Sequence, residues 1–392
     1  MAAEEAERTE AKERSEDLPD VCVVTHPLAA AGENATRSLL DILAAITGVA
    51  LVTADLPADS EIRENREVIE LTKQGAGDSI LTAGWRFVLN QIRMCRVIRL
   101  RDEPVVLFFG ATSYVLPILF ARLVGKNVLV QPRGDVPLTL RIDWERRLPV
   151  GIARGLAGLV RGLERAGFWM AHGVITYTPS MARELGLDPN SNRVFPTGAR
   201  YIRTDEFAVT TPYQERDQIV GFLGRLDEEK GIRSLASVAR ELPDGITFRF
   251  VGDGELRGWL ESTLVEELRT EQVEIVGWVA HDAVPEHLNE MRLLVHPSRA
   301  TEGLPTTILE GLSCGTPAYA SPVSGIPDVV RDGETGFLMD THDPTALAED
   351  VESILDRPDL ESISENGREM IMAEFTFDAA CDRYTEILSR FA

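Results

Sequence analysis

Short apolar runs alternate with helical stretches along the chain, and this alternation constrains the fold more than any other feature. The first half contains five such runs, at residues 21–25, 49–53, 105–109, 128–131 and 171–178. Helical patterns lie between them over 35–46, 84–101 and 113–124, and a long arginine-bearing helical region precedes the last run. Strands that alternate with helices are typical of βαβ units, so we expect a parallel sheet with helices on both faces.

The pattern stops at a polar stretch, 204–217, and then begins again. Further apolar runs follow at 218–224, 247–252, 273–276, 292–297 and 317–320, with helical patterns over 232–241 and 255–271. The fold class that this predicts is α/β, with two Rossmann-like domains. Ligands of such domains bind outside the carboxyl ends of the strands, so we expect a site there, in a cleft between the two domains.

The length of 392 residues suits two domains. We predict an acidic disordered tail at 1–18, a first Rossmann-like domain at 19–203 and a second at 218–375. The remaining segment, 376–392, is expected to form a C-terminal helix that packs back on the first domain.

Charge is distributed unevenly along the chain. The net charge is −23, yet residues 21–200 carry 21 Lys and Arg against 17 Asp and Glu, whereas 201–392 carry 16 against 38. Lysine occurs only four times. A surface rich in carboxylates and poor in lysine suits high salt, which screens self-repulsion. We interpret the chain as a halophilic cytoplasmic protein; an ordinary acidic protein is the alternative.

Neither a disulfide framework nor a membrane span is indicated. The four cysteines are scattered without a CxxC pair, which favours reduced thiols. The acidic N-terminus does not resemble a secretory signal. The uncharged run Val105–Ala121 contains Gly110 and Pro117 and is shorter than the ~20 residues that a membrane span needs, so we expect a buried strand and a helix there.

The first candidate site is the stretch Gly221-Phe-Leu-Gly-Arg-Leu-Asp-Glu-Glu-Lys-Gly231. A strand ends at a glycine, a loop follows, and a helix begins near Gly231. A helix N-terminus favours anions, and Arg225 and Lys230 add two positive charges. These features indicate a phosphate site, although two solvated cations at a surface helix would give the same pattern.

Three further stretches follow later strands. The glycines in Phe250-Val-Gly-Asp-Gly-Glu255 would allow a ligand to approach the backbone closely. An ordinary turn is the alternative interpretation. Glu302-Gly-Leu-Pro-Thr-Thr-Ile-Leu-Glu310 places two carboxylates around a helix start, with Pro305 as its first residue. Carboxylates accept hydrogen bonds from sugar diols. Gly315-Thr-Pro317 and Ser321-Pro-Val-Ser-Gly-Ile-Pro327 surround another strand.

The order of these motifs resembles the C-terminal domain of the retaining glycosyltransferases of family 4, the glycosyl transferases group 1, which have the GT-B fold. The matching stretches are GRLDEEKGI, VGDGEL, VGW, HPS, EGLPTTILE, GTPAYAS, GIPDVV and DGETGFL, between Gly221 and Asp340. The first half matches more loosely, at 171–180 and 193–198.

The resemblance implies roles for individual residues. Arg225 and Lys230 would hold the donor diphosphate and stabilise its developing charge, and Glu302 would bind donor-sugar hydroxyls. Glu310 would bind the ribose. The other expected donor contacts come from Gly32, Gly224, Gly252, Gly303 and Leu304. The resemblance implies a nucleotide-diphosphate sugar as donor substrate, no cofactor and no metal.

The first domain, which the resemblance makes the acceptor domain, departs from the family pattern. The loop after its first strand offers one usable glycine, Gly32, for approach to phosphates. Where many members have a histidine near the fourth strand, this chain has Gln131-Pro-Arg-Gly-Asp135. Arg133 and Asp135 are therefore our acceptor-side candidates, and no catalytic base is assigned. His26, His281, His287 and His296 are interpreted as structural or surface residues.

Arginines in the first half form two clusters. The first cluster lies in a single predicted helix and consists of Arg86, Arg93, Arg96, Arg99 and Arg101, with Val88, Leu89, Ile92 and Cys95 largely on the opposite side. The second cluster consists of Arg141, Arg146, Arg147, Arg154, Arg161 and Arg165. Each cluster alone is more typical of a solvated helix face. Together, with Trp85, Trp144 and Trp169, they predict contact with an anionic membrane, at the inner face of the cell membrane, and no nucleic acid.

The hypothesis with the most support is a retaining transferase that moves a hexose-type sugar to a lipid-linked acceptor, such as polyprenyl phosphate, or to a surface glycan precursor. A GT-B nucleotide-sugar epimerase and a non-catalytic nucleotide-sugar-binding protein remain alternatives. A dinucleotide-dependent oxidoreductase is disfavoured because no GxGxxG follows a predicted first strand.

Overall fold

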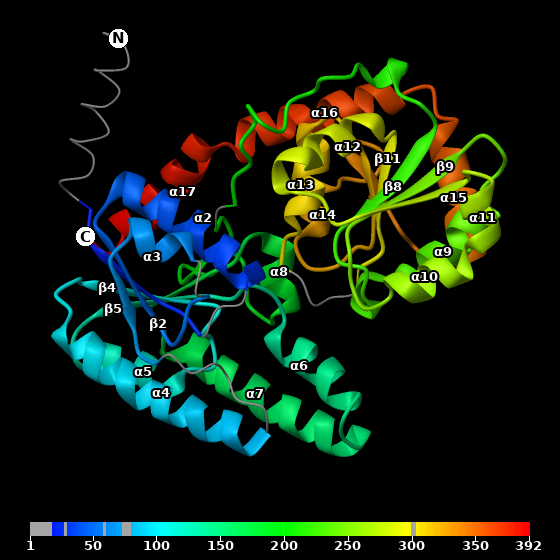
Figure 1. Ribbon diagram of the computed structural model, residues 1–392. Coiled ribbons are helices and arrows are strands. Elements are labelled where there is room, and N and C mark those ends of the chain that lie inside the picture. Colours follow the sequence, from blue (N-terminus) through cyan, green and yellow to red (C-terminus); the bar gives the residue numbers. More distant parts are fainter. Residues whose placement is uncertain (1–17, 27–29, 58–59, 73–79, 199, 299–302) are drawn as a thin grey trace, which may run out of the picture. The chain divides into compact units, whose positions relative to one another are not determined.

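The computed structural model describes residues 18–26, 30–57, 60–72, 80–198, 200–298 and 303–392, with backbone only at 30–31 and 80–84. The chain divides into two compact units (Figure 1). The first consists of Met1–Arg200 with Ala380–Ala392, and the second of Tyr201–Ala379. Our expected boundaries lay at 203 and 376, so each differs from the observed division by a few residues.

The first unit is built on a seven-stranded parallel sheet of order β3-β2-β1-β4-β5-β6-β7. Its strands are β1 Val21–Val24, β2 Val49–Thr53, β3 Val68–Glu70, β4 Val105–Phe109, β5 Asn127–Gln131, β6 Gly173–Ile175 and β7 Val194–Phe195. The direction of the strand order reverses between β1 and β4, where Val21 pairs with both Val49 and Val105. Such a reversal opens a crevice at the carboxyl ends of the strands.

Three helices cover one face of this sheet, as Figure 1 shows: α4 Ile80–Leu100, α5 Val115–Leu123 and α7 Val150–Met170. Met94 of α4, Ile118 of α5 and Phe168 of α7 pack with strand residues in one apolar core. The other helices are α2 Ala30–Ile46, α3 Glu61–Asn65, α6 Val136–Glu145, α8 Pro179–Glu184 and α17 Phe377–Ser389. Among the described residues, no helix combines the length and apolar content needed to span a membrane.

The second unit contains a six-stranded parallel sheet of order β10-β9-β8-β11-β12-β13. Its strands are β8 Ile219–Leu223, β9 Thr247–Val251, β10 Val273–Gly277, β11 Leu293–His296, β12 Ala318–Ala320 and β13 Gly336–Leu338. Its helices are α9 Ile232–Glu241, α10 Arg257–Thr263, α11 Val265–Arg269, α12 Val284–Glu290, α13 Thr306–Ser313, α14 Ile326–Val329, α15 Pro344–Leu355 and α16 Leu360–Glu374. Three short 3₁₀ helices are η1 Tyr213–Glu215, η2 Glu228–Lys230 and η3 His281–Ala283.

The predicted α/β class with two Rossmann-like sheets is confirmed. The run expected at 105–121 is strand β4 followed by helix α5, and the helix expected at 232–241 is α9. Sequence reasoning missed β3, β7 and β13, which have two or three residues each. Strands this short carry too few residues for a period-2 pattern to be recognised.

Two expected elements differ in extent. The helix predicted over 255–271 is two helices, α10 and α11, which meet at Leu264. Leu264 is fully buried, with φ −106° and ψ 32°, outside the helical region. The strand predicted over 171–178 is shortened to Gly173–Ile175. The side chain of Thr178 caps the next helix, α8, by accepting a hydrogen bond from the Met181 amide.

The polar stretch 204–217 was expected to be a linker, but it packs as part of the second unit. Phe207 and Tyr213 are buried, and so is Arg216. The Arg216 guanidinium donates to the carbonyls of Met291, Cys314 and Gly315. Two of these carbonyls lie at the C-terminal end of α13, where a helix leaves acceptors unsatisfied. One arginine therefore ties the segment to that helix end, which the polar composition concealed.

Candidate functional site

The loops after β8 and β9 approach each other too closely for side chains. A Cβ atom at Gly252 would lie 1.9 Å from the Gly224 carbonyl oxygen. Gly224 has φ 149° and Gly252 has φ 136°, a region that L residues with side chains rarely adopt. The structure thus requires glycine at both positions. It places these two expected donor-contact residues together at the carboxyl edge of the second sheet.

The loop after β8 is held by Asp227. The Glu255 amide donates to its carboxylate at 3.3 Å, and a Cβ atom at Gly254 would lie 2.7 Å from the same oxygen. Asp227 also pairs with Arg225 at 2.5 Å, and Glu229 pairs with the same guanidinium. The Arg225 side chain is 62% exposed. This predicted phosphate ligand is therefore accessible at the edge, with two carboxylates beside it.

Lys230 is positioned by the glycine that follows it. Gly231 has φ 73° and caps the start of α9, and a Cβ atom on it would lie 2.9 Å from the Pro297 carbonyl oxygen. Lys230 therefore lies beside the end of β11. Burial, followed by the charge of Arg225, lowers the pKa of Lys230 to about 8. Glu229 and Asp227 oppose this shift. A lysine with a lowered pKa in such a place is typical of a functional site.

His296, the last residue of β11, lies next to this lysine. It is 1% exposed, and burial, followed by the charge of Lys230, lowers its pKa to about 3. The Ser298 hydroxyl lies 3.0 Å from His296 Nε2. The ring is neutral and stacks with Phe222 at a centroid separation of 6.3 Å. His296 is structural in this sense, as expected, but it borders the site, which sequence reasoning did not foresee.

Helix α13 carries the other end of the expected donor segment. It begins at Thr306, and Pro305 is its N-cap with φ −65° and ψ 124°, rather than its first helical residue as predicted. The extended ψ of Pro305 keeps that residue outside the helix. Gly303 and the buried Leu304 precede it, and the Gly303 carbonyl accepts from the Gly325 amide at 2.8 Å. Glu302 lies outside the described residues.

Glu310 is a buried carboxylate in the second turn of α13. Its residue is 7% exposed, and its Oε1 lies 3.9 Å from Nε2 of His281. His281 is exposed in η3 and packs against Phe207, with ring centroids 5.3 Å apart. A buried carboxylate next to an exposed imidazole can accept hydrogen bonds from a diol. His281 is thus a site neighbour that its position in the sequence did not reveal.

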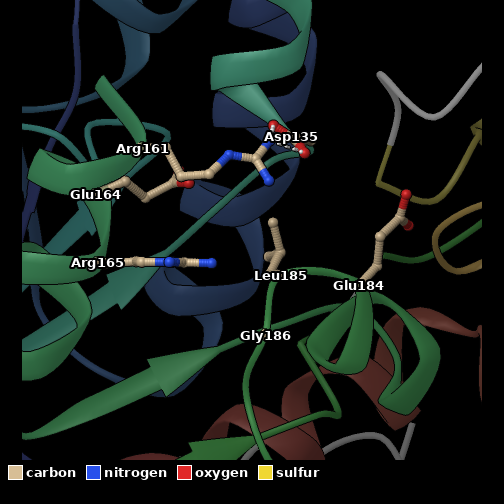
Figure 2. Close-up of a pocket in the computed structure, with 7 residues that line it drawn as sticks. All are labelled: Asp135, Arg161, Glu164, Arg165, Glu184, Leu185 and Gly186. Carbon is tan, nitrogen blue, oxygen red and sulfur yellow. Dashed lines mark hydrogen bonds and ion pairs between the residues drawn. The ribbon is translucent and has the colours of Figure 1, made fainter. Parts of the chain in front are cut away.

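The acceptor-side candidates do not share one environment. Asp135 caps α6 by accepting from the Leu138 amide at 2.8 Å, and it pairs with Arg161 at 2.6 Å. Figure 2 shows the Arg161 side chain reaching from α7 toward Asp135, in a small pocket also lined by Glu164. Arg133 is not among the residues that line this pocket.

Glu164 gives the pocket in Figure 2 a titratable group. Burial raises its pKa to about 7, whereas the hydrogen bond that Thr112 donates to it at 2.8 Å opposes this shift.

The expected donor contact at Gly32 is placed differently from our prediction. It lies in the first turn of α2 instead of a loop, and its carbonyl accepts from Thr36 Oγ1 at 2.9 Å. Its role remains a prediction.

A family model described as glycosyl transferases group 1 matches residues 204–370. This stretch includes β8 to β13, the loop that carries Arg225, the 3₁₀ helix η2 that ends at Lys230, and helix α13 with Glu310. The chain carries a group 1 glycosyltransferase domain. The resemblance drawn from the motifs is thereby confirmed for the second unit.

Among curated relatives, the alpha-D-kanosaminyltransferase of Streptomyces kanamyceticus is 33% identical over 173 residues, which are 43% of this chain and 45% of that protein. The matched part of this chain therefore spans under half the length of that relative. A mannosyltransferase of Mycobacterium tuberculosis, named GDP-mannose-dependent alpha-(1-6)-phosphatidylinositol monomannoside mannosyltransferase, is 26% identical over 79% of this chain and 85% of its own.

Solved structures resemble the whole chain in fold. Anabaena HepE, solved in complex with UDP and glucose, superposes with a TM-score of 0.69 at 15% identity, covering 95% of this chain and 99% of its own. The sucrose-phosphate synthase of Thermosynechococcus elongatus gives 0.72 at 19% identity, covering 95% and 98%. At these identities the likeness concerns the fold alone.

Proposed function

We propose that the chain is a retaining glycosyltransferase that moves a hexose-type sugar from a nucleotide-diphosphate sugar to a lipid-linked or surface-glycan acceptor. The observation that carries the proposal is the convergence at one sheet edge of Lys230, the glycine pair Gly224 and Gly252, and the start of α13. A partly buried ammonium beside backbone that excludes side chains suits a diphosphate that must approach closely.

Each part of this edge has a task in the proposed reaction. Lys230 and Arg225 bind the diphosphate and stabilise the charge that develops on it as the glycosidic bond breaks. Arg225 exchanges its contacts with Asp227 and Glu229 for the donor. Glu310 binds the ribose, and Glu302 binds the sugar hydroxyls. Within this proposal, retention, the hexose donor and independence of metal follow from the family resemblance.

The curated relatives support this choice over the alternatives. The relative that matches over most of this chain is named for a GDP-mannose donor and a phosphatidylinositol monomannoside acceptor. An epimerase would convert its donor without an acceptor, and a non-catalytic binding protein would leave the donor intact. Neither alternative accounts for the arginine-rich surface of the first unit described below.

Donor turnover tests the proposal directly. The full chain, in high salt to suit a halophilic protein, is incubated with UDP-, GDP- and ADP-sugars and with polyprenyl phosphate in vesicles. We expect acceptor-dependent release of one nucleoside diphosphate and an α-anomeric product from an α-linked donor, detected by proton NMR. Donor conversion without acceptor would instead identify an epimerase, and binding without conversion a binding protein.

A surface of the first unit combines exposed apolar side chains with arginine. Every exposed large apolar side chain that the structure describes in this unit lies on α4, α5 or α7, or directly after α5. They are Trp85, Val88, Ile92, Leu100, Leu116, Leu119, Leu123, Val124, Val150, Ile152, Leu159 and Trp169. Val88 and Ile92 were expected opposite the arginines, but both share the exposed side with them, because α4 buries Asn90, Gln91, Met94 and Ile98 instead.

The charge of these three helices is opposite to that of the chain. Together they carry Arg86, Arg93, Arg96, Arg99, Arg122, Arg154, Arg161 and Arg165, and one carboxylate, Glu164, which is buried. In a chain of net charge −23, this separation of charge needs an explanation. Exposed tryptophans beside arginines match the boundary between lipid headgroups and acyl chains, and anionic lipids complement the positive charge.

We therefore propose that α4, α5 and α7 rest on an anionic membrane, at the inner face of the cell membrane. Trp85 and Trp169 are 65% and 76% exposed. Replacing both with serine is expected to reduce co-flotation with anionic liposomes at least several-fold. The matched control is Trp278→Ser in the second unit, where the indole is 75% exposed. Equal flotation of both variants, or none by the wild type at moderate salt, would contradict membrane docking.

A further inference from the structure

Residues from five strand ends converge at the carboxyl edge of the first sheet. A Cβ atom at Gly110, after β4, would lie 2.9 Å from Arg133 Cδ, after β5, and 3.3 Å from His26 Cε1, after β1. The Arg200 guanidinium carbon lies 4.6 Å from the ring centroid of Tyr177, which follows β6. His26 and Gly110 follow the two strands of the β1–β4 reversal, the place where open α/β sheets bind ligands, and Arg133, Tyr177 and Arg200 follow β5, β6 and β7 along the same edge.

The two guanidinium groups are close enough to affect each other. Burial lowers the pKa of Arg133, the charge of Arg200 lowers it further, and Tyr177 opposes the shift. Arg133 is also held over the Phe109 ring, with its guanidinium carbon 5.6 Å from the centroid. Two guanidinium groups that affect each other in a partly buried place favour the binding of an anion.

Neutral hydrogen-bonding groups complete the cluster. Burial, then the charge of Arg133, lowers the pKa of His26 to about 4, so this imidazole is neutral near pH 7. His26 Nδ1 and Gln131 Nε2 are buried and have no hydrogen-bond partner among the residues that the structure describes. Gln131 is held in place by Tyr384, whose hydroxyl donates to Gln131 Oε1 at 2.7 Å. An amide nitrogen oriented in this way can donate to a ligand.

We propose that Arg133 and Arg200 bind a phosphate ester of the acceptor, with Gln131 and His26 as additional hydrogen-bonding groups. Guanidinium forks match phosphate oxygens in pairs. A phosphate carries a charge of about −1.5 to −2 near pH 7 and three acceptor oxygens, so it can accept hydrogen bonds from both guanidinium groups and from the Gln131 amide. The acceptor part of this inference rests on the proposed function; the phosphate site itself does not.

Phosphate binding can be measured without glycosyl transfer. In the full chain with Lys230→Ala, which weakens any phosphate site in the second unit, inorganic phosphate is titrated by calorimetry. Adding Arg133→Gln is expected to raise the dissociation constant roughly 10- to 100-fold. Arg200→Gln should act in the same direction, and Arg133→Lys should restore part of the affinity. The matched control is Arg183→Gln on the exposed face of α8.

The outcomes separate this inference from the proposed function. Phosphate affinity that is equal in Arg133→Gln, Arg200→Gln and Arg183→Gln would overturn the site, whatever the donor chemistry. If Arg133→Gln does not fold, judged by circular dichroism, Arg200→Gln decides alone.

Polyprenyl phosphate in neutral vesicles and a soluble hexose phosphate are then tested as competitors of inorganic phosphate. Displacement by either supports an acceptor phosphate and identifies its source, and displacement by neither overturns the acceptor role. Failure of wild-type donor turnover counts only against the proposed function.

Discussion

Replacing Lys230 with alanine is expected to lower kcat/KM for glycosyl transfer roughly 100- to 1000-fold, about 3–4 kcal/mol of transition-state stabilisation. The ammonium lies beside the end of β11, where it would meet the charge that develops on the departing diphosphate. Arg233→Ala is the matched control. That exposed arginine is the second residue of α9, and it pairs with Glu228 of η2 at 2.5 Å. Steady-state kinetics of both variants, in the same salt, make the comparison.

The same variant should separate stability from activity. The pKa of Lys230 is lowered from its ordinary 10.5 to about 8 by burial, so the folded protein holds this proton less tightly than the unfolded chain does. Below pH 8 the buried charge therefore opposes folding. Lys230→Ala should keep or raise the free energy of unfolding at pH 7 while activity falls. A variant that loses activity only because it unfolds would contradict this.

The pH dependence of the wild type follows from the same pKa. Lys230 is charged below pH 8 and neutral above it in the protein without donor. Because kcat/KM reports ionisation in the free enzyme, it should fall as the pH rises through about 8. In Lys230→Arg the charge persists, so this decline should move to higher pH. An unchanged profile in that variant would exclude Lys230 as the titrating group.

Glu310→Ala is expected to weaken nucleoside diphosphate binding roughly 10- to 100-fold, because hydrogen bonds to a charged group contribute about 1.5–3 kcal/mol each. The carboxylate is 7% exposed and held within 3.9 Å of His281, so it is positioned before a ligand binds. Calorimetric titration with the nucleoside diphosphate identified by the turnover assay measures the loss. Glu286→Ala, on the exposed side of α12, is the control.

A ligand without the ribose diol assigns this loss to a contact. The wild type should bind the 2′,3′-dideoxy nucleotide more weakly than the normal one. In Glu310→Ala the two nucleotides should bind alike, because the acceptor of both hydroxyls has been removed. If the variant still discriminates between them as the wild type does, Glu310 does not bind the ribose.

The motifs of the second unit were predictable because they are local. The strand at 247–251 and the helix at 232–241 follow from apolar periodicity, and the glycines at 224 and 252 were expected to admit a ligand. The structure adds the reason for those glycines, which is the contact of one loop with the other. Errors arose where long-range packing decided the outcome, as at Arg216, whose burial depends on the end of α13.

The first unit shows the limit of sequence reasoning more clearly. Its arginine clusters were visible in the sequence, but the sequence did not show that α4, α5 and α7 lie on one face of the sheet (Figure 1). It also did not show that Trp85 of α4 and Trp169 of α7 are exposed. Arg133 was a candidate, whereas Arg200 was not, because strand order brings them together over a long separation in the chain. Val88 and Ile92 were assigned to the wrong side of α4, since helical spacing fixes relative angles and the sheet selects the buried side.

The sequence by itself determined the two Rossmann-like sheets, the family of the second unit and the loops that carry its charged residues, because periodicity and turn chemistry act between near neighbours. Only the tertiary structure decided how those residues behave. Burial beside β11 gives Lys230 its lowered pKa, and burial in α13 positions Glu310. The order of parallel strands brings Arg133 and Arg200 close enough to affect each other at the edge of the first sheet. Electrostatic energy depends on distance and on exclusion of water, and both are fixed by packing between distant segments.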